Sequence, residues 1–168
     1  QLGTAHAVSQ AAPHLADKNG KTIVLTGDTP LISQETIENL LESHNDNISG
    51  MVLTATQDNP KGYGRIIRSN SEVMGIVEEK DASSDEKAIK EVNTGIFCFD
   101  NALLFKALPL ISSNNAQEEF YLTDIVSTMK SVSSKDFTSV ALNDPEEALG
   151  VNNRIQLAQA EKFMRRKI

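Results

Sequence analysis

A carboxylate directly after an apolar run is the feature of this sequence most suited to chemistry. Residues 22–26 have the composition of a strand buried on both faces of a parallel sheet, and Gly27-Asp28-Thr29-Pro30 ends it with a turn. Open α/β sheets bind ligands at the carboxyl ends of their strands, which places Asp28 where a ligand would bind. One aspartate can hold Mg²⁺, because water and phosphate oxygens complete the octahedron. Gly-Asp-Thr-Pro is also good turn chemistry, so a purely structural role stays open.

Polar residues also interrupt or follow other apolar runs. Asn93-Thr94-Gly95 lies inside the run 92–99, which indicates either a bulge or a close approach to a ligand. Glu78-Glu79-Lys80-Asp81 follows the run 73–77; such a cluster is usually a solvated edge, with a ligand role as the alternative. Gly62-Tyr63-Gly64 is either a backbone platform or a turn.

Other kinds of chemistry are not indicated. His6, His14 and His44 have no cysteines or acids at metal-ligand spacing, which argues against zinc. No Ser-His-Asp or Cys-His set is present. The single cysteine, Cys98, lies in the apolar run 96–99, so we expect a buried structural thiol and no intrachain disulfide.

Strands and helices alternate in the first third of the chain. Apolar side chains at helical spacing predict a helix over 4–15, and a strand over 22–26, a helix over 33–42 and a strand over 50–55 follow. This strand–helix–strand order implies a right-handed crossover.

Antiparallel pairing is expected after Gly64. The runs 65–68 and 73–77 flank a polar turn and predict a hairpin, so the fold class is α/β with a mixed sheet. The remaining predicted elements are a strand over 92–99, a helix from Asp100 to about 108, a helix over 121–129, a strand over 137–142, a capped helix start at 144–147 and a closing helix over 153–166.

Length and composition limit the number of domains and the kinds of partner that are expected. With 168 residues, of which 39% are hydrophobic, the chain can form one domain or part of one. The net charge is −7 and the basic residues are scattered, so neither nucleic acid nor an anionic membrane is indicated as a partner. No apolar stretch approaches the roughly 20 residues that span a bilayer. A reducing, cytoplasmic location is expected.

Six motifs follow one another in a distinctive order. They are Gln1-Leu2-Gly3-Thr4-Ala5-His6-Ala7, Gly27-Asp28-Thr29-Pro30-Leu31, Gly62-Tyr63-Gly64-Arg65-Ile66, Ile76-Val77-Glu78-Glu79-Lys80-Asp81-Ala82, Asn93-Thr94-Gly95 and Gly150-Val151-Asn152-Asn153-Arg154. In this order they resemble the bacterial bifunctional N-acetylglucosamine-1-phosphate uridyltransferases and glucosamine-1-phosphate acetyltransferases. The resemblance implies a Rossmann-like mixed sheet of the nucleotide-diphospho-sugar transferase type, with residues 1–168 as part of the uridyltransferase domain.

The resemblance also implies roles for single residues. Asp28 and Asn152 would be the catalytic pair that holds Mg²⁺, and Gly64, Glu78 and Asn93 would contact the N-acetylglucosamine. The full set of expected substrate contacts is Gly3, Thr4, Thr26, Gly27, Asp28, Gly64, Glu78, Asn93 and Asn152, of which Gly3 and Thr4 would meet the uracil nucleotide. Tyr121 and Thr123 are further candidates for the sugar pocket.

The implied reaction makes UDP-N-acetylglucosamine and pyrophosphate from UTP and N-acetylglucosamine 1-phosphate, for cell-wall precursors. The sugar phosphate attacks the α-phosphorus of UTP and expels pyrophosphate, so no protein nucleophile is needed. Catalysis would then depend on alignment and on neutralisation of charge. This agrees with the absence of an acid–base pair among the motifs.

The sequence departs from the family pattern in several respects. Ala5 and Glu118 stand where the family usually has glycine. Gln1 suggests a start inside the domain, because the family's first strand and its Gly-rich loop, which wraps the triphosphate, are not among these residues. We therefore expect little or no turnover from the 168 residues alone. The left-handed β-helix that transfers acetyl groups and builds the family's trimer is also not among them, so neither property is expected.

Three other interpretations stay open. The first is a related sugar-phosphate nucleotidyltransferase that uses another nucleotide or hexose phosphate. The second is a noncatalytic sugar-nucleotide-binding module. The third is a folded part of a domain that binds nothing.

Overall fold

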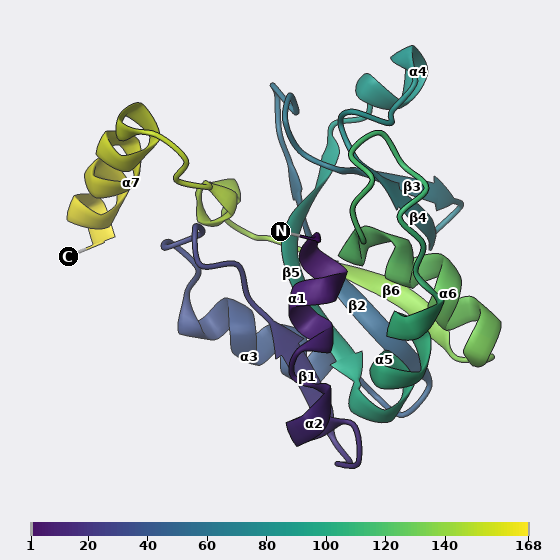
Figure 1. Ribbon diagram of the computed structural model, residues 1–168. Helices are drawn as coiled ribbons and strands as arrows, with labels where there is room; N and C mark the ends of the chain where they lie inside the picture. The colour runs from purple at the N-terminus through teal and green to yellow at the C-terminus, as the bar shows by residue number, and fades with distance from the viewer. Residues whose placement is uncertain (1, 168) are drawn as a thin grey trace.

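The computed structural model describes residues 2–167, in which helices cover both faces of a six-stranded mixed sheet (Figure 1). Gln1, which begins the first motif, lies outside the described residues. The strands are β1 (Lys21–Val24), β2 (Ile48–Thr56), β3 (Arg65–Ser69), β4 (Glu72–Val77), β5 (Glu91–Asp100) and β6 (Asp136–Ala141). The α-helices are α1 (Thr4–Ser9), α2 (Ala12–Leu15), α3 (Gln34–Ser43), α4 (Ser84–Lys87), α5 (Asn101–Ala107), α6 (Ile125–Val132) and α7 (Arg154–Lys167). Short 3₁₀ helices are η1 (Leu108–Leu110), η2 (Leu122–Asp124) and η3 (Pro145–Ala148).

The long strand β5 organises the sheet. The order is β4-β3-β5-β2-β6, and β1 pairs with β5. β2 and β6 are parallel, whereas β5 is antiparallel to β1, β2 and β3. β3 and β4 form the predicted hairpin, whose turn contains Asn70 at a φ of 55°. The predicted mixed sheet is therefore confirmed.

The prediction for β1 was wrong in two respects. β1 is only partly buried, and it pairs antiparallel with β5 through the register Lys21↔Asp100 to Val24↔Phe97. The predicted strand–helix–strand unit exists, since β1 and β2 both run antiparallel to β5 and so parallel to each other. The two strands are not neighbours, however, because β5 lies between them.

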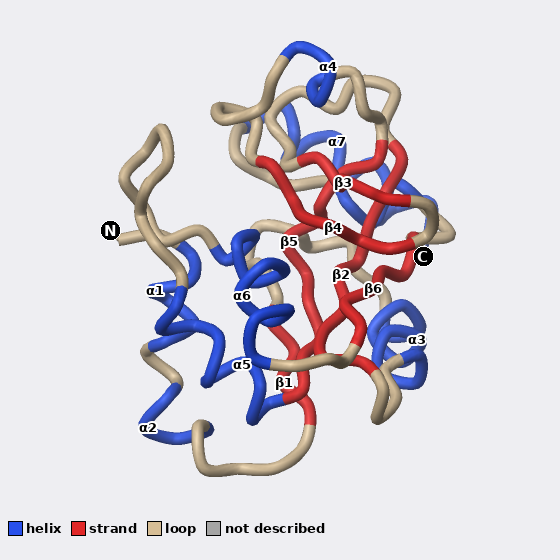
Figure 2. The backbone as a smooth tube through the Cα atoms, turned by 90° about the vertical axis from the view of Figure 1, so that its right-hand side faces the viewer, coloured by secondary structure: helices blue, strands red, loops and turns tan. Residues whose placement is uncertain are grey.

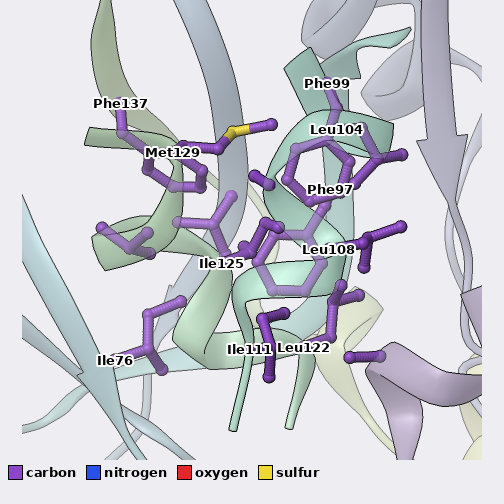
Figure 3. Close-up of a cluster of buried hydrophobic side chains, with 14 of the residues drawn as sticks. Ile76, Phe97, Phe99, Leu104, Leu108, Ile111, Leu122, Ile125, Met129 and Phe137 are labelled. Atoms are coloured by element: carbon purple, nitrogen blue, oxygen red, sulfur yellow. The ribbon is translucent and has the colours of Figure 1, made fainter. Parts of the chain in front are cut away.

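Each face of β2 and β5 packs against its own helical layer. Figure 2 shows α1, α2, α5 and α6 on one side of the sheet and α3 on the other. Phe97 and Phe99 point into the larger core, where their rings stack at 5.4 Å between centroids beside Leu104 and Ile125 (Figure 3). The alternate residues of the same strands point the other way and join Leu40 of α3 in a second core: Met51, Leu53, Ile96 and Cys98. The two continuous apolar runs are thus explained by burial on both faces.

The Cys98 thiol is a buried structural group, as predicted. It is fully buried in the core beneath α3, and this burial raises its pKa to about 11. A thiol with so high a pKa carries almost no thiolate at neutral pH, so it is a poor nucleophile.

Several helix boundaries differ from the prediction. The single helix expected over 4–15 is two helices, because Pro13 has no N–H to donate to Ser9 in a continuous helix. The helix start at Asp144 is confirmed as a cap, since its side chain accepts a bond from the Glu146 amide, but only one 3₁₀ turn follows. The helix expected over 121–129 begins at Ile125, after the turn η2.

The ends of the other helices agree more closely with the sequence. Ser33 caps α3 by accepting a bond from the Thr36 amide, and Asp100 caps α5 in the same way from Leu103. Among residues 2–167, no helix combines the length and apolarity that crossing a bilayer requires.

Candidate functional site

A cavity of about 650 Å³ lies where α1, the end of β1, the end of β4 and the middle of β5 meet. This volume is within the usual range for small-molecule sites. Seven of the nine predicted substrate contacts line it: Thr4, Thr26, Asp28, Gly64, Glu78, Asn93 and Asn152. Thr123 also lines it, whereas Tyr121 is buried and does not. Segments that are up to about 150 residues apart in the sequence therefore converge on one cavity.

Gly3 and Gly27 are the two predicted contacts that do not line the cavity. Gly3 has a φ of 105°, and a Cβ there would lie 2.5 Å from the backbone oxygen of Phe120. Its glycine is thus required by packing between the N-terminal segment and the segment before η2. Gly27 has no atom within 4 Å of an added Cβ and lies in the turn between two lining residues, Thr26 and Asp28.

Asp28 lies in a turn that does not use its side chain. Thr26 and Thr29 close the turn. Their hydroxyl oxygens are 2.9 Å apart, and the Thr29 hydroxyl donates to the Thr26 carbonyl at 3.0 Å. Asp28 is exposed and faces the cavity. The turn chemistry that the sequence suggested is therefore present, but it leaves the Asp28 carboxylate available.

Asp28 and Asn152 meet across Gly150. The Val151 amide donates to the Asp28 carbonyl at 2.7 Å. A Cβ on Gly150 would lie 3.9 Å from the Asp28 carboxylate and 3.5 Å from the Asn152 side-chain nitrogen, so both side chains converge there. Asn153 caps α7 by accepting a bond from the Gln156 amide, and the Asn152 side chain is not the cap.

The donors at this point suit Mg²⁺ better than a transition metal. One carboxylate and one side-chain amide offer hard oxygen ligands, which Mg²⁺ prefers. No group of three or more His, Cys, Asp or Glu within residues 2–167 is arranged to bind a metal. An ion at Asp28 and Asn152 would therefore need phosphate oxygens and water to complete its coordination.

Asn93-Thr94-Gly95 forms a bulge in β5, one of the two alternatives that the sequence left open. Val52 pairs with Phe97 and Thr54 with Asn93, so that Leu53 alone faces three residues of β5. The Thr94 hydroxyl donates to the Leu53 carbonyl at 2.8 Å. Gly95 adopts a φ of 80°, and a Cβ there would lie 2.8 Å from Cγ2 of Thr26. The bulge turns Asn93, Thr94 and Gly95 towards the cavity.

Glu78, Gly64 and Asn93 lie in contact with one another. The Asn93 amide donates to the Gly64 carbonyl at 2.9 Å, and a Cβ on Gly64 would lie 3.4 Å from the Glu78 carboxylate. Glu78 accepts a bond from the Thr123 hydroxyl at 3.1 Å. Burial raises the pKa of Glu78, the Thr123 bond opposes this, and Asp124 and Asp81 add to it. The solvated-edge interpretation is therefore wrong for Glu78.

An ion pair that the sequence did not predict supports this end of the cavity. Arg65 is almost fully buried, and its guanidinium lies 2.7 Å from the Glu79 carboxylate. Glu79 also accepts a bond from the Gly62 amide at 3.2 Å, and Arg65 donates to the Tyr63 carbonyl. The predicted hairpin could have revealed this ion pair, because Glu79 lies two residues beyond Val77, the cross-strand partner of Arg65. Lys61 is the one cation among the described lining residues, and no motif in the sequence pointed to it.

The two departures from the family pattern are accommodated differently. Ala5 lies in α1 and is buried in the larger core, where its methyl group packs. Glu118 adopts a φ of 55°, a left-handed conformation that favours glycine.

Comparison with known proteins extends over the whole chain. Residues 1–143 match the model of the nucleotidyl transferase family. The bifunctional protein GlmU of Geobacillus sp. (strain WCH70) is 54% identical over 170 residues, and that of Bacillus subtilis (strain 168) is 49% identical. Each alignment covers 100% of this chain and 37% of the relative, so the chain spans just over a third of the length of these curated relatives. The resemblance that the motifs indicated is confirmed.

A solved structure supports the fold. The structure of a Bacillus anthracis protein assigned as a glucose-1-phosphate thymidylyltransferase, crystallised with sucrose, superposes with a TM-score of 0.65. It is 19% identical, and the match covers 96% of this chain and 60% of that one. Because the family model matches most of the sequence and the architecture agrees, this chain belongs to the nucleotidyl transferase family.

Proposed function

We propose that these residues form the sugar-nucleotide site of a uridyltransferase, which makes UDP-N-acetylglucosamine and pyrophosphate from UTP and N-acetylglucosamine 1-phosphate for cell-wall precursors. One observation carries the proposal. A single cavity is lined at one point by the oxygen donors Asp28 and Asn152 and at another by the hydrogen-bonding residues Glu78 and Asn93. The first pair suits a metal with phosphates, and the second suits a sugar.

Each residue has a role that follows from its chemistry. Glu78 and Asn93 offer acceptors and donors to the sugar hydroxyl and acetamido groups, with Gly64 leaving room for them. Asp28 and Asn152 would hold Mg²⁺, which neutralises phosphate charge when bound. Thr4 and Thr26 also line the cavity, whereas Gly3 and Gly27 would act through their backbone.

The reaction needs no group on the protein to form a covalent bond. An oxygen of the sugar phosphate bonds to the α-phosphorus of UTP as the bond to pyrophosphate breaks. These residues would hold the two substrates in line and exclude water. Because the relatives are longer than this chain, turnover should be tested in a protein that also has the Gly-rich loop. A cytoplasmic location stays a prediction, as does the expectation that the 168 residues alone show neither trimer formation nor acetyl transfer.

Thermal unfolding tests the proposal directly. UDP-N-acetylglucosamine with Mg²⁺ should raise the melting temperature of the 168-residue chain, because binding adds about 2.7 kcal/mol at a hundredfold excess over Kd. Asp28→Ala should abolish the Mg²⁺-dependent part of the shift. Asp46→Ala, which changes an exposed aspartate outside the cavity, is the matched control. No shift with the wild-type chain at millimolar ligand would contradict the proposal.

Thermal unfolding, together with an assay for product, separates the alternatives. A larger shift with a thymidine diphosphate sugar would favour a related sugar-phosphate nucleotidyltransferase. Stabilisation without product, in a protein that includes the Gly-rich loop, would favour a noncatalytic binding module.

A further inference from the structure

Two loop segments carry the residues proposed to hold the metal, and they are joined at two points. At the cavity, the Val151 amide donates to the Asp28 carbonyl at 2.7 Å. Away from the cavity, one carboxylate oxygen of Glu147 accepts bonds from the Ser33 amide at 3.1 Å, the Ser33 hydroxyl at 3.3 Å and the Thr36 hydroxyl at 2.6 Å. Segments 28–33 and 147–151 are thus tied together at both ends.

Glu147 is placed unusually for a glutamate. It is only 6% exposed, and glutamates are seldom buried unless their charge is compensated. Its compensation comes from the first turn of α3, where Ser33 is the cap and the helix dipole favours a negative charge. Bonds from amide and hydroxyl donors to a carboxylate are among the stronger hydrogen bonds in proteins. The contact therefore fixes η3 against α3 across more than 110 residues of sequence.

We propose that Glu147 is a positioning residue for the metal site. By holding η3 on the N-terminus of α3, it sets the register of residues 150–152 against the Asp28 turn, so that Asn152 stands beside Asp28. Glu147 is not among the residues that line the cavity, so it acts through the segment that it anchors. This inference rests on the proposed function for its metal, but the anchoring itself can be tested without ligand.

Loss of the anchor should leave η3 attached. Ala148, next to Glu147, is fully buried and packs with Ala55 and Val92 in a small core. That contact is apolar and nondirectional, so it holds the segment without setting its register. Variants of Glu147 or Thr36 should therefore fold, and should differ from wild type mainly in how firmly residues 147–151 are held.

Hydrogen exchange of the Val151 amide, measured by NMR on the 168-residue chain, tests the anchor. Glu147→Gln and Thr36→Val should each speed exchange by about tenfold or more, because each weakens a bond to a buried carboxylate. Thr36→Ser retains the hydroxyl and should restore slow exchange. Glu146→Gln is the matched control in the same turn, because the Glu146 carboxylate pairs with Arg166 at a long 3.7 Å, in a solvent-accessible pair. Unchanged exchange in both test variants would overturn the proposal.

Ligand affinity with and without metal tests the positioning role. UDP-N-acetylglucosamine binding is titrated with Mg²⁺ and with EDTA. In Glu147→Gln and Thr36→Val, the affinity in EDTA should stay within about twofold of wild type, whereas the gain from Mg²⁺ should fall about tenfold. A merely structural role would lower both affinities together. If Val151 exchanges faster but the gain from Mg²⁺ is kept, Glu147 anchors the segment without positioning the metal site, and the proposal is wrong.

Failure of the proposed function gives a different result. In that case wild type shows no gain from Mg²⁺, or Asp28→Ala keeps the gain in full. The exchange of Val151 would then still decide whether Glu147 anchors the segment.

Discussion

The two ends of the cavity are built in different ways. The proposed sugar end, which consists of Gly64, Glu78 and Asn93, lies at strand ends and a bulge of the sheet and is supported by the buried Arg65. The proposed metal end, which consists of the exposed residues Asp28 and Asn152, lies on two loop segments that are joined by backbone and side-chain bonds. A group on a sheet is held precisely by its neighbours, whereas a loop can adjust. We therefore expect the proposed sugar end to be preformed, whereas the proposed metal end needs the Glu147 anchor to keep its register and phosphate oxygens to complete the coordination of an ion.

The largest expected effect comes from Gly95, which follows Asn93 in the bulge and packs against Thr26, two residues before Asp28. Gly95→Ala should lower the free energy of unfolding by about 2–4 kcal/mol, because the left-handed φ of 80° and the 2.8 Å contact with Thr26 both oppose a side chain. Urea unfolding measures this. Adding Thr26→Ser removes the contacting methyl group and should recover part of the loss. Gly75→Ala, in β4 with open space around it, is the control. A loss below about 0.5 kcal/mol would mean that the bulge is not packed tightly against Thr26.

A smaller effect, with opposite signs for stability and binding, is expected at Glu78. Its pKa is raised by burial, so folding favours the protonated form and wild type should lose stability as pH rises from the ordinary glutamate pKa through the raised value. Glu78→Gln should remove this pH dependence and raise the melting temperature at neutral pH. It should also weaken UDP-N-acetylglucosamine binding by about tenfold. Melting curves between pH 4 and 8, with and without ligand, test both parts; unchanged binding would remove Glu78 from the sugar end.

The smallest effect concerns Glu118, which belongs to neither end. Glu118→Gly should stabilise the fold by roughly 0.5–1 kcal/mol, because relief of the left-handed strain exceeds the entropy that glycine adds to the unfolded chain. Binding should not change. Destabilisation, or an altered Kd, would show that the Glu118 side chain makes a contribution that outweighs the strain.

The sequence was most informative where a local rule applied. Caps at Ser33, Asp100 and Asp144, the hairpin around Asn70 and the bulge at Gly95 each depend on one residue type in one place, and the structure contains all of them. The gathering of most proposed contacts in one cavity was expected from the resemblance, because six ordered motifs constrain the fold more than periodicity does.

Interactions between distant segments could not be predicted. An apolar run does not say which strand will pair with it, so β1 was expected in a parallel sheet, whereas it pairs antiparallel with β5. Likewise, the sequence marks the acidic pair at 146–147 only as part of a helix start. That Glu147 is buried against Ser33 and Thr36 depends on how η3 folds back towards α3, and no local rule gives that.

The contact between Thr26 and Gly95 also limits how such a site could evolve. With a φ of 80° and a methyl group 2.8 Å from its would-be Cβ, position 95 can accept almost nothing but glycine. Thr26 does not have a positive φ, so the backbone at position 26 does not restrict the residue type in the same way. Variation in the floor of the cavity, and with it any drift towards a different ligand, should therefore begin at position 26, while position 95 stays unchanged.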